Sequence, residues 1–201
     1  MAEIIKAKEL NKRALKKIIE KLRKGSTIIY PTETCYGIGC SIKSKKAIER
    51  IYSIKGRKKG KPFPILFAAM KNAGKIAVIT REAEKLAGRF MPGPLNLIVE
   101  KKGSKGSTIC FRIPGNKIAF ALAKGLNEGL ISTSCNKSGE KEAYSARKAI
   151  KEFSGKVDII IDAGPLPKRK PSTVYDIKAG KALREGKIKE RKIIKVLKAK
   201  K

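Results

Sequence analysis

Clustered basic side chains are the residues of this sequence with the most evident capacity for chemistry. The segment from Lys43 to Arg81 holds twelve basic residues and one acidic residue. Within it, Lys55, Arg57 and Lys61 stand at the end of a predicted helix, where a rigid backbone could direct several cations at one polyphosphate. Arginine offers phosphate or carboxylate a planar fork, and lysine offers a point charge. Composition by itself favours the alternative that this run is a solvated surface.

Arg112 is a basic residue in a different setting. It ends an apolar run and is followed closely by Pro114, so its side chain is predicted to lie within the sheet region. An unpaired cation in such a place is energetically expensive. Either a carboxylate of the protein or the carboxylate of a ligand must neutralise Arg112, and the residues leave both alternatives open.

Two hydroxyl-rich segments follow predicted strands. They cover residues 132–136 and 172–173, and both combine serine with threonine. Such residues commonly cap turns. They equally suit a ligand that presents polar groups at the end of a sheet.

Several kinds of site are excluded. Histidine is absent, and Cys35, Cys40, Cys110 and Cys135 are scattered without a C-x-x-C pair. Histidine-based triads, histidine general bases and zincin-type metal sites are therefore ruled out, and no protein metal site is expected. The cysteines are expected to be reduced, mostly buried thiols. The Walker A pattern is missing, and the glycines at 37–39 do not continue to a dinucleotide fingerprint.

The composition predicts one compact domain over residues 1–201, with a core at about 8–177 and a basic tail at about 178–201. Hydrophobic residues make up 41% of the chain, aromatics 5%, and tryptophan is absent, so the core must be aliphatic. The 49 basic and 17 acidic residues give a formal net charge of +32, which favours phosphate-bearing partners. A general enrichment in lysine is the alternative explanation.

No segment approaches the roughly 20 apolar residues of a membrane span. The first 24 residues are predicted to form an amphipathic helix rather than a signal peptide. A cytoplasmic protein without membrane contact is expected.

Periodicity and turn signals predict alternating strands and helices. The predicted helices cover residues 8–24, 44–56, 80–90, 118–126 and 145–153. The predicted strands cover residues 26–30, 62–69, 95–100, 108–113, 130–134, 157–162 and 173–177. Residues 31–39 are predicted to form a polar loop at the end of the first strand. This alternation predicts an α/β fold around a twisted, mixed sheet, with a tail that forms a surface strand and helix or frays.

Six short motifs occur in order along the chain. They are Pro31-Thr32-Glu33-Thr34-Cys35-Tyr36-Gly37, Lys55-Gly56-Arg57 with Lys61-Pro62, Pro92-Gly93-Pro94, Arg112-Ile113-Pro114, Ser134-Cys135-Asn136-Lys137-Ser138-Gly139 and Pro171-Ser172-Thr173-Val174. In this order and spacing the set resembles the YrdC family over residues 31–174. The resemblance implies a twisted open α/β fold, YrdC-like, with a deep basic cleft.

The resemblance also implies an activity, threonylcarbamoyl-AMP synthesis. In that reaction L-threonine, bicarbonate and ATP, accompanied by Mg²⁺, give threonylcarbamoyl-adenylate and pyrophosphate. The product serves threonylcarbamoyladenosine modification of tRNA through a downstream threonylcarbamoyl transferase complex. The alternative is a non-catalytic module that binds tRNA or double-stranded RNA through phosphate contacts.

Carried over position by position, the resemblance assigns residues to each substrate. The threonine-binding residues it implies are Thr34, Arg112, Ser132 and Ser172. The ATP-binding residues it implies are Lys55, Arg57, Lys61, Thr108, Ser134, Glu142 and Arg184, of which Lys55 and Arg57 are the catalytic candidates.

The sequence departs from the family pattern at three positions. Leu66 replaces a histidine that often contacts threonine, Asn116 replaces another frequent histidine, and Cys135 replaces a small alanine. The first departure removes one threonine contact, and none of the three touches the phosphate-binding cations.

Overall fold

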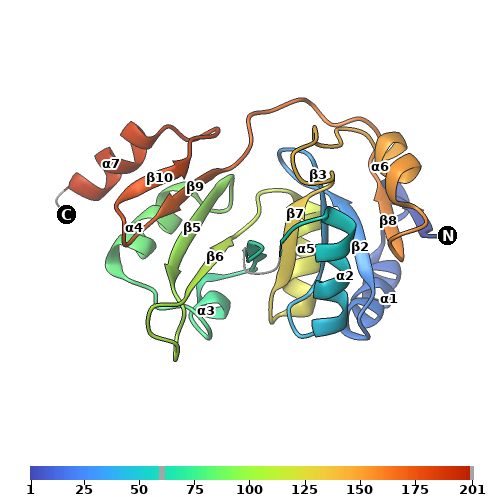
Figure 1. The fold of residues 1–201 in the computed structure, drawn as a ribbon, viewed down its shortest axis with the longest axis horizontal. Coiled ribbons are helices and arrows are strands. Elements are labelled where there is room, and N and C mark those ends of the chain that lie inside the picture. The colour runs from blue at the N-terminus through green and yellow to red at the C-terminus, as the bar shows by residue number, and fades with distance from the viewer. Residues whose placement is uncertain (59–61, 200–201) are drawn as a thin grey trace.

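The structure is a computed structural model that describes residues 1–58 and 62–199 (Figure 1). Lys61, one of the predicted ATP-binding residues, lies outside the described residues. The strands are β1 (Glu3–Lys6), β2 (Thr27–Pro31), β3 (Tyr36–Ser41), β4 (Ile65–Leu66), β5 (Leu95–Glu100), β6 (Thr108–Arg112), β7 (Leu130–Ser134), β8 (Ile159–Asp162), β9 (Thr173–Asp176) and β10 (Lys181–Arg184). The helices are α1 (Lys12–Arg23), α2 (Lys45–Lys55), α3 (Met70–Ala73), α4 (Arg81–Phe90), α5 (Lys117–Leu126), α6 (Ala146–Phe153) and α7 (Glu190–Lys198), with a 3₁₀ turn, η1, at Ala7–Glu9.

The strands form one mixed sheet in the order β1-β8-β2-β3-β7-β4-β6-β5-β9-β10. Strand β4 has two residues and pairs parallel with β6 and antiparallel with β7, so it joins the two larger groups of strands seen in Figure 1. The prediction of an α/β fold with an open mixed sheet flanked by helices is confirmed.

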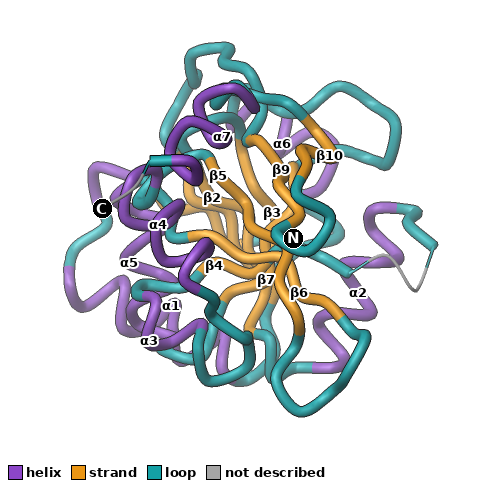
Figure 2. The backbone as a smooth tube through the Cα atoms, turned by 90° about the vertical axis from the view of Figure 1, so that its left-hand side faces the viewer, coloured by secondary structure: helices purple, strands orange, loops and turns teal. Residues whose placement is uncertain are grey.

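Helices cover both faces of the strand group around β2. Ile28 and Tyr30 of β2 pack with α1 and α5, whereas Ile29 between them belongs to the core that includes α2. This alternation follows from the two-residue period of a strand. Figure 2 shows α1 and α5 on one side of the strands and α2 on the other.

Helix starts follow the capping signals in the sequence. Ser44, Thr80 and Ser145 each accept a hydrogen bond from the backbone N–H three residues later and so begin α2, α4 and α6. Gly56 ends α2 in the left-handed region, at φ 58°.

Two predictions near the N-terminus are wrong in detail. The first 24 residues do not form one helix, because Glu3–Lys6 join the sheet as β1 beside β8. The helix predicted over residues 8–24 begins only at Lys12, because η1 comes first and Asn11 caps α1. The loop expected at 31–39 overlaps strand β3, which begins at Tyr36. The glycines of β3 led to the loop prediction. Gly39 is nevertheless required in the strand, because a Cβ there would stand 2.0 Å from the carbonyl oxygen of Ile131 on β7.

The basic tail forms a strand and a helix over its described residues. Strand β10 pairs with β9, and α7 packs against α4. Ile188 and Ile193 are buried in the core, and the hydroxyl of Thr173 donates to the carbonyl of Ile188 at 2.6 Å. The tail thus completes the sheet edge beside β9.

Candidate functional site

A cavity of about 860 Å³ opens where the two groups of strands face each other. It is lined by the β2–β3 loop, the end of α2, the loop after β7, and residues of β5, β6, β9 and β10. The predicted site residues that line it are Thr34, Lys55, Arg57, Thr108, Arg112, Ser132, Ser134, Glu142, Ser172 and Arg184. The fold therefore brings every predicted site residue within its described part to one cavity.

Arg112 lies at the centre of a buried polar cluster. Its Nη1 donates to Oε1 of Glu33 and, at 3.1 Å, to the hydroxyl of Ser172. The side chains of Arg112 and Glu33 are only 7% and 13% exposed. Of the two alternatives that the sequence left open, the structure shows a carboxylate of the protein beside Arg112. Arg112 also lines the cavity.

Glu33 forms that ion pair through only one of its two carboxylate oxygens. Its Oε2 is buried and has no hydrogen-bond partner in the described part of the chain. An unpaired buried carboxylate oxygen is costly. This unpaired oxygen lies beside the guanidinium of Arg112, which the resemblance assigns to threonine.

The β2–β3 loop is shaped by Thr32. The Thr32 hydroxyl donates to the carbonyl of Cys35 at 2.6 Å and accepts from the N–H groups of Thr34 and Cys35 at 3.2 and 3.3 Å. This turn places the buried Thr34 on the cavity wall. The hydroxyl of Thr34 lies 3.2 Å from that of Thr32.

A hydrogen bond from Tyr30 orients the hydroxyl of Ser132. The phenol of Tyr30 is fully buried and donates to Oγ of Ser132 at 2.7 Å. Burial raises the pKa of Tyr30 well above its ordinary value. Tyr30 therefore remains a neutral donor, which leaves the proton of the Ser132 hydroxyl available to a ligand.

Lys55 holds the loop that follows β7. Its ammonium donates to the carbonyls of Ser134 and Asn136 at 2.7 and 2.6 Å and to Oδ1 of Asn136 at 2.8 Å. These three bonds use all three N–H groups of a lysine. Burial lowers the pKa of Lys55 to about 8. Lys55 therefore contributes its charge and the shape of this loop, whereas direct donation to a phosphate would require one of these bonds to break.

Asn136 links Lys55 to the rest of that loop. Its Oδ1 also accepts from the hydroxyl of Ser134 at 2.6 Å, and its Nδ2 donates to the carbonyl of Glu140 at 2.7 Å. The sequence placed Asn136 in a polar loop without assigning it to the site. Its position in a motif with Ser134 was the available signal.

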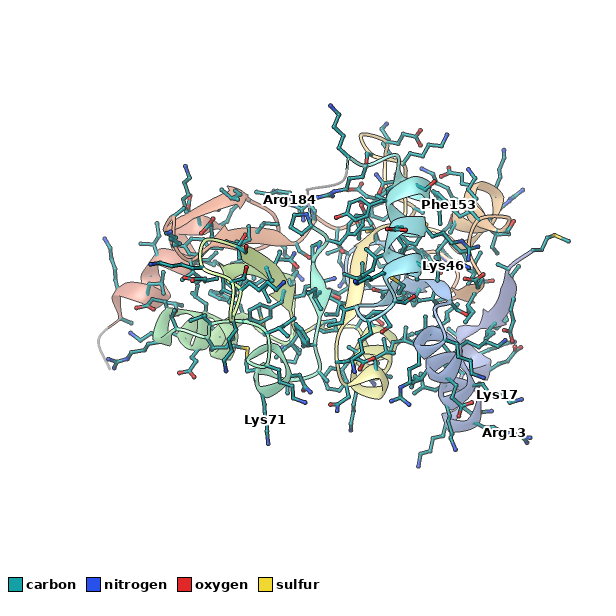
Figure 3. The ribbon with its side chains drawn as sticks, turned by 60° about the horizontal axis from the view of Figure 1, so that its bottom comes forward. Arg13, Lys17, Lys46, Lys71, Phe153 and Arg184 are labelled. Carbon is teal, nitrogen blue, oxygen red and sulfur yellow. The ribbon has the colours of Figure 1, made fainter. Side chains whose placement is uncertain are left out.

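The more accessible cations lie toward the rim of the cavity. The guanidinium of Arg57 stacks over the ring of Phe63 at 5.0 Å, and Nε of Arg184 donates to the carbonyl of Ser172 at 3.1 Å. In Figure 3, Arg184 lies between the two groups of strands, whereas Arg13, Lys17 and Lys71 point away from the molecule. Basic side chains thus meet in the cavity from elements that are distant in the sequence.

Sequence reasoning missed Glu33 and Asn96 as parts of this site. Asn96 of β5 lines the cavity and is 4% exposed. Its position between leucines in a predicted strand was the available signal, because a polar side chain inside an apolar strand needs a reason.

The departures from the family pattern have structural roles here. Leu66 is fully buried in the core beneath α1 and α5, and Asn116 caps α5 by accepting from the N–H groups of Ile118 and Ala119. Cys135 is also buried and joins the core.

The thiols on the cavity wall do not favour nucleophilic chemistry. Burial raises the pKa of Cys35 to about 11 and that of Cys110 to about 12, so both stay protonated near neutral pH. Among the described residues, no three acidic, cysteine or histidine side chains are grouped so as to bind a metal ion. None of the helices within 1–58 and 62–199 has the length and apolar character to span a bilayer.

The fold and the site define an open-sheet α/β protein with a polar, arginine-lined cavity of small-molecule size. The family model of the Sua5, YciO and YrdC proteins, described as "Telomere recombination", matches residues 20–186. The chain belongs to this family.

Individual relatives span most of the chain. The threonylcarbamoyl-AMP synthase of Thiobacillus denitrificans is 32% identical over 172 residues, which cover 81% of this chain and 90% of the relative. YciO of Escherichia coli is 33% identical over 178 residues, which cover 82% and 84% of the two chains. The crystal structure of Pyrococcus abyssi Sua5 complexed with L-threonine matches with a TM-score of 0.87 and 30% identity; the match covers 98% of this chain and 61% of that one.

Proposed function

We propose that this protein is an L-threonylcarbamoyladenylate synthase. The observation that carries the proposal is the meeting of two sets of groups in one cavity. Arg112 and Ser172 suit a carboxylate, and Arg57 and Arg184 suit a phosphate chain. An amino acid and a nucleotide could therefore lie side by side. A relative named threonylcarbamoyl-AMP synthase and a related structure with bound L-threonine support this choice of substrates.

Overall identity does not separate this activity from other members of the family. The values for the synthase of Thiobacillus denitrificans and for YciO are 32% and 33%. The proposal consequently rests on the residues of the site rather than on the overall similarity.

The first part of the reaction joins threonine to carbon dioxide derived from bicarbonate. Arg112 holds the threonine carboxylate, while the hydroxyls of Thr34 and Ser132 contact its other polar groups. The neutral amine attacks the carbon of carbon dioxide and becomes a carbamate. The proton that the amine loses combines with the hydroxide left from bicarbonate to give the water of the overall reaction. A carbamate decomposes in water, so the protein mainly has to exclude solvent and hold the groups in place.

The second part activates the carbamate. A carbamate oxygen attacks the α-phosphorus of ATP, and the bond from that phosphorus to the bridging oxygen of pyrophosphate breaks. Arg57 and Arg184 counter the negative charge that grows on the phosphates. The sum is threonine, bicarbonate and ATP giving threonylcarbamoyl-adenylate, pyrophosphate and water.

Magnesium enters this scheme as part of the nucleotide. Because the described residues offer no acidic cluster to hold the ion, Mg²⁺ would arrive on the triphosphate, where it neutralises phosphate charge. The product would pass in the cytoplasm to a threonylcarbamoyl transferase complex that modifies tRNA.

The test is pyrophosphate release from the purified protein with each substrate omitted in turn. Release should require threonine, bicarbonate and ATP together. Release without threonine would contradict the proposal. Salt-sensitive tRNA binding without any pyrophosphate release would instead favour the RNA-binding alternative.

A further inference from the structure

The carboxamide of Asn96 is a polar group on the cavity wall whose oxygen the protein leaves unused. The residue is 4% exposed, and its Oδ1 is buried without a hydrogen-bond partner among the described residues. Its strand neighbours Leu95 and Leu97 point into the apolar core. A buried carbonyl oxygen without a hydrogen-bond partner costs free energy in the empty protein. A ligand that donates a hydrogen bond to this oxygen would recover that free energy.

Strand register places Asn96 between the two proposed substrates. Asn96 pairs with Val174 of β9, which in turn pairs with Arg184 of β10. On the other side Leu97 pairs with Phe111, and the same register continued by one residue sets Asn96 opposite Arg112. All four residues of this row, Arg112, Asn96, Val174 and Arg184, line the cavity.

The order of these residues across the sheet matches the order in which the proposed reaction joins threonine, the one-carbon unit and ATP. Neighbouring strands lie about 4.8 Å apart, so the backbones of the two arginines stand roughly 14 Å from each other along the row. Their side chains converge on Ser172, where Arg112 donates to the hydroxyl and Arg184 to the carbonyl. Asn96 is one strand from the arginine assigned to threonine and two strands from the one assigned to ATP. In the proposed reaction the one-carbon unit links the amino acid to the α-phosphorus, so Asn96 is placed to face it.

A carboxamide also has the chemical character that bicarbonate requires. Bicarbonate presents an O–H donor and an anionic oxygen on the same carbon, and the asparagine side chain presents a carbonyl acceptor and an N–H donor on one carbon as well. Rotation about the broad χ2 torsion of asparagine can turn both groups toward the cavity. We propose that Asn96 binds bicarbonate and then the carbamate formed from it. This assignment rests on the proposed function and extends it to a substrate for which that proposal names no residue.

The experiment measures pyrophosphate release in buffer that is freed of dissolved carbon dioxide before bicarbonate is added, with bicarbonate varied at saturating threonine and ATP. Asn96→Ala should raise the KM for bicarbonate about tenfold or more, as expected for a hydrogen bond to an anion. Asn96→Asp should raise it further, because its carboxylate repels an anion while keeping the shape of asparagine. The Kd of threonine, measured by calorimetry, should change less than about threefold in both variants.

A matched control comes from the same strand. Ile98 lies two residues along β5 and lines the same cavity. Ile98→Val reshapes the wall without removing a hydrogen-bonding group, so the ratio of the bicarbonate KM to the threonine KM should stay at the wild-type value.

Thermal unfolding of the free protein separates a binding role from a structural one. Asn96→Leu removes the unpartnered carboxamide oxygen and should raise the Tm while impairing the use of bicarbonate. A lower Tm in Asn96→Leu and Asn96→Ala would mean that Asn96 supports the fold, and would overturn the inference.

Failure of this inference can be told from failure of the proposed function. An active wild-type protein whose Asn96→Ala variant keeps the wild-type bicarbonate KM, or loses threonine affinity to at least the same extent, overturns the inference alone. A wild-type protein that does not release pyrophosphate from the three substrates overturns both.

Discussion

Arg112 on β6 and Glu33 in the β2–β3 loop, 79 residues apart in the sequence, form a buried ion pair that also borders the cavity. Glu33 holds the guanidinium in place when no substrate is bound. In the proposed function it would also compete with the threonine carboxylate for the same positive charge. The pair would then link the stability of the free protein to its affinity for threonine.

Glu33→Gln should lower the stability of the free protein and strengthen its response to threonine. Glutamine keeps a hydrogen-bond acceptor near Arg112 but removes the countercharge, at a cost of about 1–3 kcal/mol. A threonine carboxylate would then restore that charge. Scanning fluorimetry should show a lower Tm without ligand and a larger rise in Tm on adding threonine than in wild type. A smaller rise would contradict this account of Arg112.

Arg112→Ala and Arg184→Ala should affect different substrates. The loss of a hydrogen-bonded cation removes about 1.5–3 kcal/mol, which corresponds to at least a tenfold change in affinity. Arg112→Ala should therefore raise the KM for threonine far more than that for ATP, and Arg184→Ala should do the reverse. Arg57→Ala should behave like Arg184→Ala. Steady-state kinetics with each substrate varied separately provides the measurement, and equal losses for both substrates in every variant would show that the assignments are wrong.

Lys55 should make activity sensitive to alkaline pH. Its pKa is about 8 because of burial, and a neutral amine has only two N–H groups for its three acceptors. Pyrophosphate release should fall as the pH rises through about 8. Lys55→Arg, which stays charged, should lack this decline in its normalised pH profile. The same decline in the arginine variant would assign it to another group.

The contribution of Lys55 to stability should change in the opposite direction. Below pH 8 lysine is charged in both the folded and the unfolded chain, and the folded protein bears the cost of burying the charge. Between about pH 8 and the ordinary lysine pKa of 10.5, the folded protein binds fewer protons than the unfolded chain, so this cost diminishes. The difference in the free energy of unfolding between wild type and Lys55→Met should therefore shift in favour of wild type across this window, as measured by denaturant unfolding.

Gly39→Ala should be strongly destabilising, whereas Gly88→Ala should not. A Cβ at Gly39 would stand 2.0 Å from the carbonyl oxygen of Ile131, so β3 and β7 would have to separate. We expect a loss of roughly 2–4 kcal/mol. Gly88 lies inside α4 with nothing within 4 Å of the added atom, and alanine there should stabilise by up to about 1 kcal/mol. Chemical denaturation of both variants measures the contrast, and comparable stability of the two would refute the close approach of β3 and β7.

Local signals in the sequence determined most of the elements of this fold. Helix caps at Ser44, Thr80 and Ser145 depend on residues within one turn, and strands β5 and β7 have the bounds that their apolar runs predict. The motifs likewise indicated which side chains would meet in one cavity. Such features are local in the chain, or are carried by residue types at fixed spacing, so they can be inferred without coordinates.

Tertiary structure alone decided the pairings between distant segments. Strand β3 is rich in glycine and was predicted as a loop, because its need for small residues comes from the carbonyl of Ile131 on a strand far along the chain. The partner of Arg112 could not be chosen from the sequence either, since both a ligand and a protein carboxylate satisfied the same electrostatic requirement. The place of Asn96 between two arginines depends on the register of four strands, a property that arises only when the sheet is assembled.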